Sequence, residues 1–598
     1  MESIRTIFLK PGTEKVKARD GENLFFALVS AGIPIRGECG GKGICGRCRV
    51  RFVENAPPPT ELEKRFLSLY ELDEGWRLAC QHVIEKDVSL WIPFFGETFE
   101  KKIAKLPGSV PFSPKAAFIY YVEVPFSERS REGSKIENLK AALGENIGIS
   151  LSVLQELPQA LKEGKGKVTL IQVGKKVVTL RPGHRAIPLL GLAVDLGTST
   201  LAAYLLDLHK GIELGEKAIA NPQLSFGADV LSRIAYVHEK GKEGLERLRE
   251  AVIEGVNRLA AELCSKARVA TDEIVHIVVV GNPTMLHLFL GVDPTPIGEA
   301  PFKPVWREVL SLRAKELNLR MVHPRAVVEV PPLISGYVGA DTVACILACR
   351  LHEKESPCLL LDLGTNGEIV LGWKERLLTC SAAAGPAFEG GRISCGMPAL
   401  KGAISHVHLT QGSLNFKVIG EIDPLGICGS GLVDLLALLL EEGLVDATGR
   451  FSFRPDHPLF SRVIGCGNNA KFLVAKGIYL TQRDIRELQL AKAAIRAGIE
   501  LLLDKAGLSP QEIHCVYLAG TFGSEMRPQA LVKIGLLPTG LLPKVQPIGN
   551  AAASGAIIML LNKSAFKEAI FVAKKAEYVE LSSEKQFVKK FVANMRFT

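Results

Sequence analysis

The sequence lacks the features that define several common functional classes. Its longest apolar runs, such as residues 551–561, are well short of the roughly 20 residues that span a bilayer. Strand-like alternation, rather than an apolar signal core, follows the first residues. No basic stripe interleaves with aromatic side chains as a nucleic-acid groove requires, and a net charge of +9 is mild for 598 residues. We therefore expect no membrane span and no nucleic-acid partner, and we predict a cytoplasmic protein whose charge weakly favours an acidic protein partner.

Three catalytic motifs are also missing. The chain has no Walker A loop, no Gly-x-Ser-x-Gly elbow and no His-Glu-x-x-His pair. Its composition, 47% apolar and 23% charged, is ordinary for a globular protein. At about 100 to 200 residues per domain, the length predicts three to five units.

What the chain does have is an unusual cysteine cluster. The run RGECGGKGICGRC at 36–48 places three thiols in one glycine-rich loop, and RLACQ at 77–81 adds a fourth. Glycine allows positive φ and close backbone approach, so that thiolates can converge on two irons while amides hydrogen-bond the sulfurs. We predict a [2Fe-2S] cluster, and hence single-electron transfer, with four ligands: Cys39, Cys45, Cys48 and Cys80.

A zinc site built from the same thiols is the alternative, although structural zinc sites usually pair two short cysteine hooks. Five residues separate the first two cysteines, a spacing that resembles the adrenodoxin-like branch of ferredoxins. The chain has nine further cysteines, scattered among apolar or glycine-rich neighbours. Most of these are predicted to be small core residues.

The order of short strands, helices and turns predicts a multidomain α/β and α+β protein. Residues 1–95 form a β-grasp ferredoxin-like module, and 96–115, rich in proline, glycine and lysine, form a linker. Residues 116–189 form a small α+β middle domain without a recognisable chemical motif. Strands rich in Val, Leu and Ile alternate with amphipathic helices over 190–598, the pattern of a large α/β nucleotide-binding body.

Two segments of that body repeat one design. The runs VDLGTST at 194–200 and LDLGTNGE at 361–368 both end a buried strand in Asp-Leu-Gly-Thr. A single copy is also compatible with a plain hairpin turn, but two copies favour a pair of phosphate loops. Aspartates at these strand ends can hold a hydrated Mg²⁺, while glycines, hydroxyls and amides approach phosphate. The assigned residues are Asp195 and Asp362 (catalytic, and Mg²⁺ through water), Thr198 and Thr365 (catalytic), and Gly197, Ser199, Thr200, Gly364 and Asn366 (nucleotide contacts).

The paired loops resemble the phosphate 1 and phosphate 2 motifs of the acetate and sugar kinase, heat-shock chaperone and actin superfamily. That resemblance implies a two-lobed, actin-like ATPase that clamps ATP and Mg²⁺. Residues 516–524 resemble its adenosine motif, and 335–342 and 548–556 its two connecting helices, whose small residues let them cross closely. Turns at 383–391 and 426–432 suit anion or ribose contact or, equally, ordinary helix starts. These motifs add five expected nucleotide contacts: Gly385, Gly429, Gly520, Thr521 and Gly523. Lys492 is expected to be a solvated helical lysine rather than a contact to the base.

In its domain order, the whole chain is similar to the ATP-dependent reductive activators of corrinoid proteins found in acetogenic and methyl-transferring anaerobes. The resemblance implies that one electron passes from the [2Fe-2S] cluster to inactive Co(II) corrinoid, giving Co(I), with coupled ATP hydrolysis. It also implies a corrinoid protein partner, either a corrinoid/iron-sulfur protein or a demethylase corrinoid protein, and a homodimer through the ATPase body. The electron donor is unspecified.

Three alternatives remain open. The chain could activate another low-potential metalloenzyme, it could be a small-molecule kinase with a redox-sensing domain, or it could be a chaperone-like ATP switch in which the cluster only senses redox state. The kinase would need a catalytic base and a substrate pocket, and the sequence identifies neither.

Overall fold

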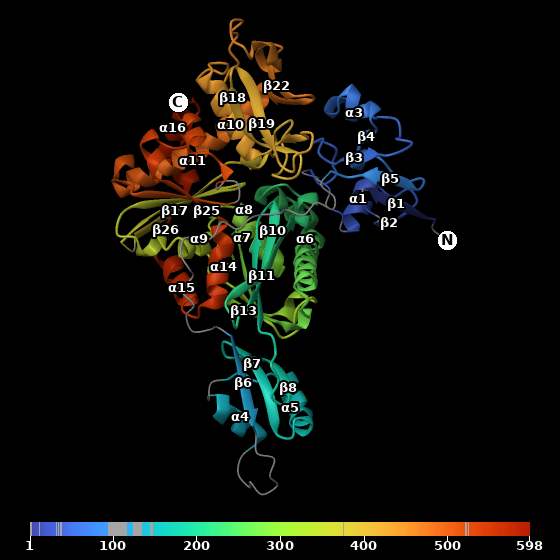
Figure 1. Cartoon of the computed structure of the whole chain (residues 1–598), viewed down its shortest axis with the longest axis vertical. Helices are drawn as coiled ribbons and strands as arrows, with labels where there is room; N and C mark the ends of the chain where they lie inside the picture. The colour runs from blue at the N-terminus through green and yellow to red at the C-terminus, as the bar shows by residue number, and fades with distance from the viewer. Residues whose placement is uncertain are drawn as a thin grey trace.

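The computed structural model describes the whole chain except residues 1, 2, 11, 13, 32, 34, 36, 38, 94–116, 124–133, 144–146, 375, 521, 522, 524 and 598. The linker expected at 96–115 and Thr521 of the adenosine motif lie outside the described residues. The rest forms a ferredoxin-like domain, a small middle domain and a two-lobed body (Figure 1). Within these ranges, no helix has the length and apolar character needed to cross a bilayer.

The ferredoxin-like domain is a mixed five-stranded sheet with one helix packed on it. The strand order is β2-β1-β5-β3-β4, with β1 antiparallel to β2 and parallel to β5. Asn23 caps the helix by accepting a hydrogen bond from the Phe25 amide, and Leu24, Phe25 and Leu28 fill the core. This confirms the β-grasp prediction. The elements are β1 (Ile4–Lys10), β2 (Lys15–Arg19), α1 (Leu24–Ser30), β3 (Arg49–Phe52), α2 (Glu63–Phe66), α3 (Leu69–Asp73), β4 (Trp76–Leu78) and β5 (Val88–Trp91).

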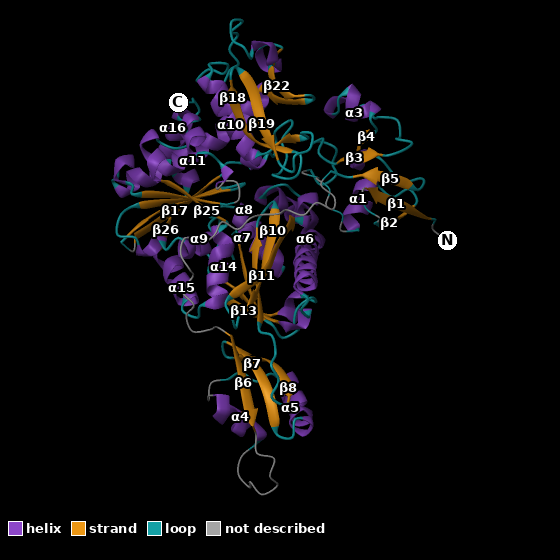
Figure 2. Cartoon of the chain, viewed as in Figure 1, coloured by secondary structure: helices purple, strands orange, loops and turns teal. Residues whose placement is uncertain are grey.

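The middle domain is a three-stranded antiparallel sheet in the order β6-β7-β8, with helices beside it (Figure 2). Helix α5 buries Val153, Leu157 and Leu161 at helical spacing against this sheet. The domain lies against lobe I of the body, where Arg325 donates to the Val178 carbonyl and pairs with Glu156. Its elements are β6 (Ala117–Glu123), α4 (Lys135–Leu143), α5 (Leu151–Glu163), β7 (Lys167–Val173) and β8 (Lys176–Pro182).

The body consists of two lobes whose sheets share five strands in the same order and directions, while the sixth strand, β13 in lobe I and β26 in lobe II, lies at opposite edges. In lobe I the sheet order is β11-β10-β9-β12-β14-β13, and in lobe II it is β25-β24-β15-β16-β17-β26. The first three strands of each lobe are antiparallel neighbours, and the next two extend the sheet in parallel from the first strand. This shared order is what a duplicated actin-like body requires, and two separate cores support it.

Lobe I contains β9 (Leu190–Leu196), β10 (Thr200–Asp207), β11 (Ile212–Ala220), α6 (Val230–Ala267), β12 (Ile274–Gly281), α7 (Pro283–Leu290), α8 (Thr295–Gly298), β13 (Leu310–Arg313), β14 (Val327–Val330) and α9 (Ala340–Ala348). Helix α6 is interrupted at Gly241, whose backbone is not helical.

Lobe II contains its six-stranded sheet, two small three-stranded sheets and the helices around them. Helix α14 then returns to the core of lobe I and crosses α9. A Cβ on Gly555 would lie 2.1 Å from the Ala344 carbonyl oxygen, which confirms the close crossing expected of small residues. The elements are β15 (Cys358–Leu363), β16 (Gly367–Trp373), β17 (Arg376–Ala382), β18 (Ala403–Thr410), β19 (Ser413–Val418), β20 (Gly426–Ile427), α10 (Gly429–Glu441), β21 (Val463–Ile464), β22 (Lys471–Ala475), β23 (Ile478–Thr481), α11 (Gln482–Ala506), β24 (Cys515–Ala519), α13 (Pro528–Lys533), β25 (Val545–Gly549), α14 (Ala551–Leu561), α15 (Ala565–Lys575), β26 (Ala576–Tyr578) and α16 (Lys585–Ala593).

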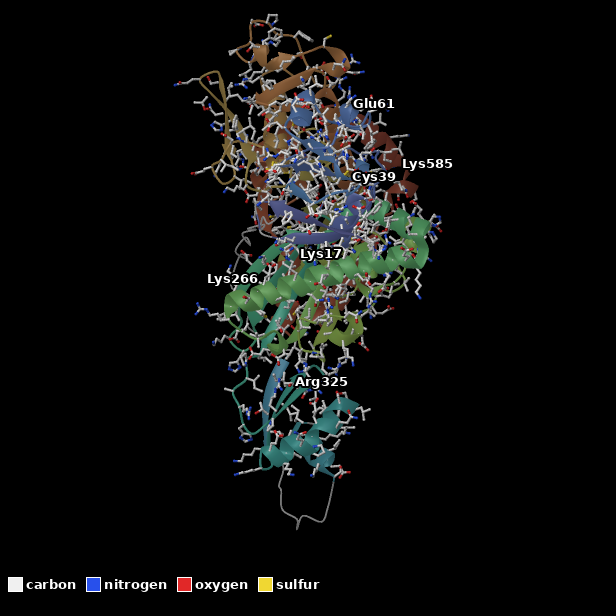
Figure 3. All side chains as sticks on the ribbon, turned by 90° about the vertical axis from the view of Figure 1, so that its right-hand side faces the viewer. Lys17, Cys39, Glu61, Lys266, Arg325 and Lys585 are labelled. Atoms are coloured by element: carbon white, nitrogen blue, oxygen red, sulfur yellow. The ribbon has the colours of Figure 1, made fainter. Side chains whose placement is uncertain are left out.

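The ferredoxin-like domain rests on both lobes. Figure 3 shows it facing the viewer, between α6 below and the small sheets of lobe II above. On the lobe I side, Ser225 donates to the Ile35 carbonyl and Lys42 pairs with Glu239 of α6. The contact with lobe II is made through Arg47, a residue of the cysteine loop. The three domains are therefore arranged so that this loop meets the junction of the lobes.

Candidate functional site

The four cysteines predicted as cluster ligands come together in two pairs. The Cys39 sulfur accepts a hydrogen bond from the Cys45 thiol, and this bond lowers the pKa of Cys39 to about 4. The Cys80 sulfur likewise accepts from Cys48, which lowers the pKa of Cys80 to about 7. Both shifts favour the thiolate forms of Cys39 and Cys80, and thiolates are the ligands of iron–sulfur clusters.

The pairing fits two metal centres better than one. Among the described residues, no three of the cysteine sulfurs lie within 4.8 Å of one another. A tetrahedral zinc ion would draw four sulfurs around a single point, whereas a two-iron cluster takes two sulfurs at each iron. The donor set therefore fits a [2Fe-2S] cluster, with Cys39 and Cys45 at one end and Cys48 and Cys80 at the other.

Glycines shape the loop around these sulfurs, as the sequence predicts. Gly40, Gly41, Gly43 and Gly46 all have positive φ. At Gly46, a Cβ would lie 2.5 Å from the Phe66 ring, so a larger residue would push the loop away from the core. Backbone amides of residues 43–45 also donate toward the Cys39 sulfur and help to lower its pKa.

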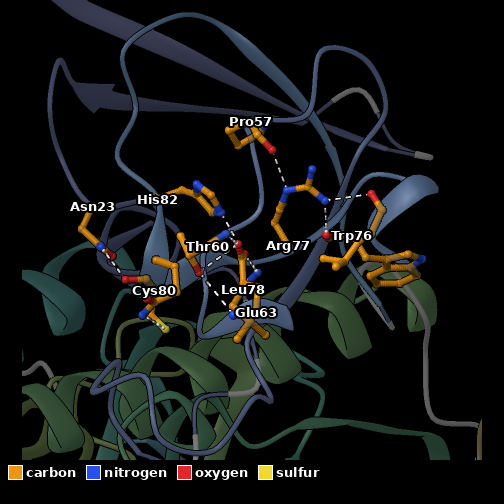
Figure 4. Close-up of polar contacts among 11 residues, drawn as sticks. Asn23, Pro57, Thr60, Glu63, Trp76, Arg77, Leu78, Cys80 and His82 are labelled. Atoms are coloured by element: carbon orange, nitrogen blue, oxygen red, sulfur yellow. Dashed lines mark hydrogen bonds and ion pairs between the residues drawn. The ribbon is translucent and has the colours of Figure 1, made fainter. Parts of the chain in front are cut away.

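A buried carboxylate supports the short 3-10 turn, Ala79–Gln81, that carries the fourth cysteine (Figure 4). Glu63 is fully buried and accepts from the Leu78 amide at 2.6 Å, the Thr60 amide at 2.7 Å and the His82 ring at 2.8 Å. The Asn23 side chain also donates to the Cys80 carbonyl at 3.0 Å. These bonds fix the backbone on both sides of Cys80. Sequence reasoning missed Glu63, because nothing in its neighbourhood marks it as buried.

We predict that a Glu63→Gln variant is less stable at pH 7 by about 2 kcal/mol. The glutamine amide has one oxygen that can accept from these donors, and its NH2 group cannot accept from them. Burial alone would raise the pKa of Glu63, but the hydrogen bonds from His82 and the backbone amides of Thr60 and Leu78 outweigh it and lower this pKa. A lowered pKa stabilises the fold above the pKa of the unfolded chain, and that stabilisation is lost as the pH falls through the folded value. The gap between wild type and variant should therefore shrink below about pH 4. The difference in stability between wild type and variant is measured by cluster bleaching at fixed temperature and stepwise lower pH. A difference that stays constant down to pH 3 would contradict the prediction.

The two phosphate loops meet across the junction of the lobes. Asp195 lies one residue before the end of β9 and Asp362 one residue before the end of β15, and both line one pocket of about 120 Å³. On the lobe I side, Arg233 donates to the Thr198 carbonyl at 2.6 Å and Asn282 donates to the Thr198 hydroxyl at 3.1 Å. Predicted residues that line this pocket are Asp195, Gly197, Thr198, Ser199, Thr200, Asp362, Gly364, Thr365, Asn366 and Gly520.

Carboxylates that the sequence analysis did not assign share the pocket. Asp341 and Glu368 lie beside Asp362, and no lysine or arginine is among the described residues that line it. Burial, followed by the charge of Asp362, raises the pKa of Asp341 to about 7. Burial, followed by Asp341, raises the pKa of Glu368. Such an excess of oxygen ligands and negative charge fits a divalent cation such as Mg²⁺, which would let phosphate enter.

Glu389 lies between the two phosphate loops. Its carboxylate accepts from the Thr365 hydroxyl at 3.0 Å and also from the Ser199 hydroxyl, so it bridges lobe II to lobe I. Four residues further on, the Ile393 carbonyl accepts from Arg47 of the cysteine loop at 3.2 Å. One short segment, residues 386–394, therefore joins the pocket to the ferredoxin-like domain.

Several candidate residues lie apart from this pocket. Gly385, Gly429 and Gly523 are not among its lining residues. A Cβ on Gly429 would lie 1.7 Å from the Phe388 carbonyl oxygen, so this glycine lets α10 pack against the segment that carries Glu389. The prediction for Lys492 is wrong. Its side chain is buried, donates to the Arg596 carbonyl at 2.5 Å and lies over the Phe597 ring, which anchors the C-terminal residues on α11. Seven of the nine other cysteines are buried, as predicted.

Four family models match the chain in sequence order. They are the 2Fe-2S iron-sulfur cluster binding domain at 7–85, the RACo linker region at 109–186, the RACo middle region at 190–354, and the C-terminal ASKHA domain of RACo at 356–598. A corrinoid activation enzyme of Eubacterium limosum, RamQ, is 32% identical over 95% of both chains. The chain belongs to the reductive activators of corrinoid proteins.

Other comparisons agree with this family. A solved structure of a reductive activator for corrinoid, iron-sulfur protein is 33% identical, with a TM-score of 0.76 over 99% of this chain and 98% of that one. A reductase of Methanosarcina barkeri for a Co(II) methylated amine-specific corrinoid protein is 27% identical over 66% of this chain and 75% of its own length. As a member of this family, the chain carries a [2Fe-2S] domain and an ASKHA domain, as the sequence predicts.

Proposed function

We propose that this chain reduces the Co(II) form of a corrinoid protein to Co(I) with the help of ATP. The observation that carries the proposal is the segment 386–394, which touches both phosphate loops through Glu389 and the cysteine loop through Ile393. A kinase whose catalysis is independent of its iron–sulfur domain needs no such connection. Membership of the activator family and the names of its relatives support a corrinoid protein as the partner.

The energetic reason for coupling is the potential of the electron. A ferredoxin-type cluster, when bound, supplies single electrons near about −400 mV. The reduced form of an acceptor with a lower potential becomes populated only if another free-energy source is coupled to the electron transfer. For one electron, a potential gap of about 59 mV corresponds to a tenfold change in the equilibrium constant, or roughly 1.4 kcal/mol. Differential binding of ATP to two states of the lobes can provide that free energy.

The residue roles follow from the pocket. Asp195 and Asp362 would hold Mg²⁺ through water, while Thr198, Ser199 and Thr365 donate to phosphate. At about 120 Å³ the pocket is smaller than the roughly 300 Å³ or more of a typical ligand site. Glu389 also occupies two of the hydroxyl donors. ATP binding must therefore separate the lobes or displace Glu389, because like charges cannot share these donors.

The test combines the purified holoprotein with a Co(II) corrinoid protein, a reductant and ATP. We expect the Co(I) absorption band to appear at an appreciable rate only when both reductant and ATP are present, with phosphate release stimulated by the corrinoid protein. The non-hydrolysable analogue AMP-PNP is the matched control for binding without turnover. Equal reduction without nucleotide would remove ATP coupling from the proposal.

Three finer points belong to the same proposal. Cys39, Cys45, Cys48 and Cys80 hold the cluster, since the loop geometry and the matching domain support this assignment. The ATPase body pairs as a homodimer, as the family resemblance implies. The chain works in the cytoplasm.

A further inference from the structure

A second cavity, of about 470 Å³, lies where the cysteine loop faces the body. Arg47, Arg49 and Arg65 line it from the ferredoxin-like domain. Arg392 and Arg483 line it from lobe II. It is separate from the nucleotide pocket, with which it shares no lining residue. Arginine stays protonated in proteins, so five positive charges surround one opening.

Neighbouring carboxylates balance only part of this charge. Arg49 pairs with Glu71 at 2.5 Å, Arg392 lies 3.4 Å from Asp229, and Glu487 lines the cavity. The buried Asp484, which accepts from Ser394 of the lining, is a fourth carboxylate, so five positive and four negative groups leave an excess of one positive charge. In the part of the chain that the structure describes, the exposed Arg483 guanidinium makes no hydrogen bond or ion pair. The Arg483 guanidinium can therefore bind a carboxylate without first losing another partner.

The cavity also reaches the redox site. Cys45 lines it, and the neighbouring Ile44 is 72% exposed at the same place. A molecule that fills the cavity therefore contacts one of the four cysteines directly. An apolar tip surrounded by charged groups is the arrangement found in small, transient and salt-sensitive protein interfaces, among which electron-transfer complexes are common.

We infer that this cavity is the docking site of the electron donor, an acidic electron-transfer protein whose carboxylates bind the arginines while its redox centre lies next to Cys45. The inference rests on the proposed role of the four cysteines in electron transfer. One electron leaves the donor and is taken up at the four-cysteine site; no bond forms and no proton moves.

The placement of the arginines indicates that the cavity binds the electron donor rather than the electron acceptor. Arg392 and Arg483 belong to lobe II, so the site is complete only while the ferredoxin-like domain rests against its own body. In that position the four-cysteine site of the ferredoxin-like domain receives the electron. Any movement of the domain toward an acceptor takes Arg47 and Cys45 away from Arg392. An excess of positive charge also attracts an acidic protein from a distance, which raises the association rate at low salt.

The test is an Arg392→Gln/Arg483→Gln double variant of the full holoprotein. The probe is a bacterial ferredoxin with two [4Fe-4S] clusters, a strongly acidic low-potential carrier. Arg320→Gln/Arg450→Gln is the matched control, because both of these arginines are exposed on the body and neither lines the cavity. Calorimetry gives the Kd of the oxidised probe, and stopped-flow absorbance gives its rate of electron transfer to the chain. Reduced methyl viologen, a small cation, serves as the second reductant.

We expect the cavity variant to bind the probe about tenfold more weakly at low salt and to accept its electrons about tenfold more slowly. The difference from wild type should vanish at high salt, where charges are screened. Reduction by methyl viologen should be unchanged, and the control variant should match wild type throughout.

Three outcomes would overturn the inference. The first is that the probe binds the cavity variant and wild type with the same Kd and reduces them at the same rate. The second is that pyrophosphate binds the cavity stoichiometrically while the probe does not, which would make the cavity a small-anion site. The third is that reduction by the probe is unchanged while electron delivery to a corrinoid protein is lost, which would assign the cavity to the acceptor. Because the binding and loading measurements contain neither corrinoid nor ATP, they remain valid even if the proposed activation of a corrinoid protein fails.

Discussion

An Asp362→Asn variant is expected to keep the visible spectrum of its cluster and to lose ATP-dependent reduction of the corrinoid protein by about 100-fold or more. Asp362 lies one residue before the end of β15 and lines the pocket together with other carboxylate, hydroxyl and amide side chains that offer oxygen ligands. Asparagine has nearly the same shape but carries no charge, so the hydrated cation that neutralises phosphate loses a ligand. Stopped-flow formation of Co(I) under saturating reductant and ATP measures the loss.

The fold of this variant should not suffer. Burial, followed by the charge of Asp362, raises the pKa of Asp341, so removing that charge relieves repulsion between buried carboxylates. Thermal unfolding is therefore expected to stay at or above the wild-type midpoint. Asp456→Asn, at an exposed position of lobe II outside the pocket, is the control and should behave as wild type. If Asp362→Asn activates the corrinoid protein at the normal rate, Asp362 does not belong to the nucleotide site.

A Cys45→Ala variant is expected to show the opposite pattern. Without one of the four thiolates the cluster is lost or becomes labile, and electron delivery should fall to the background rate. Because Cys45 lies outside the nucleotide pocket, the Kd for AMP-PNP should change by less than about threefold. Iron content, the visible spectrum and equilibrium nucleotide binding together measure this separation.

Cys466→Ala is the matched control, since Cys466 is the exposed cysteine among those the structure describes. It should retain both iron and activity. A Cys45→Ala protein that keeps a full complement of iron and a normal rate of electron delivery would show that the cluster is held elsewhere.

Local patterns in the sequence were enough to predict the elements that carry both sites. The cysteine run at 36–48 identified the cluster loop, because glycine and thiol spacing reflect contacts within a few residues. The repeated Asp-Leu-Gly-Thr runs likewise gave Asp195 and Asp362 at strand ends, where the structure has them. The two-lobed, actin-like architecture was predicted from the superfamily resemblance, and no pattern of residues predicted the strand order of either lobe.

Residues that act across domain boundaries could not be found in this way. Glu389 lies in a glycine-rich turn that reads as a helix start, and only the approach of lobe I shows that it bridges Ser199 and Thr365. Lys492 lies one position from the buried stripe of α11, and periodicity cannot show that Phe597 covers it. Arg392 and Arg47 are far apart in the sequence, so their shared cavity depends on how two domains dock.

The segment 386–394 has a thermodynamic consequence. Ile393 lies four positions after Glu389, and a chain of that length spans at most about 14 Å. A nucleotide that displaces Glu389 therefore acts on the bond between Ile393 and Arg47 within one short stretch of backbone. By linkage, the free energy with which ATP weakens the docking of the ferredoxin-like domain equals the free energy with which the docked domain opposes ATP. Under the proposed function, nucleotide affinity therefore depends on whether the ferredoxin-like domain is docked on the body.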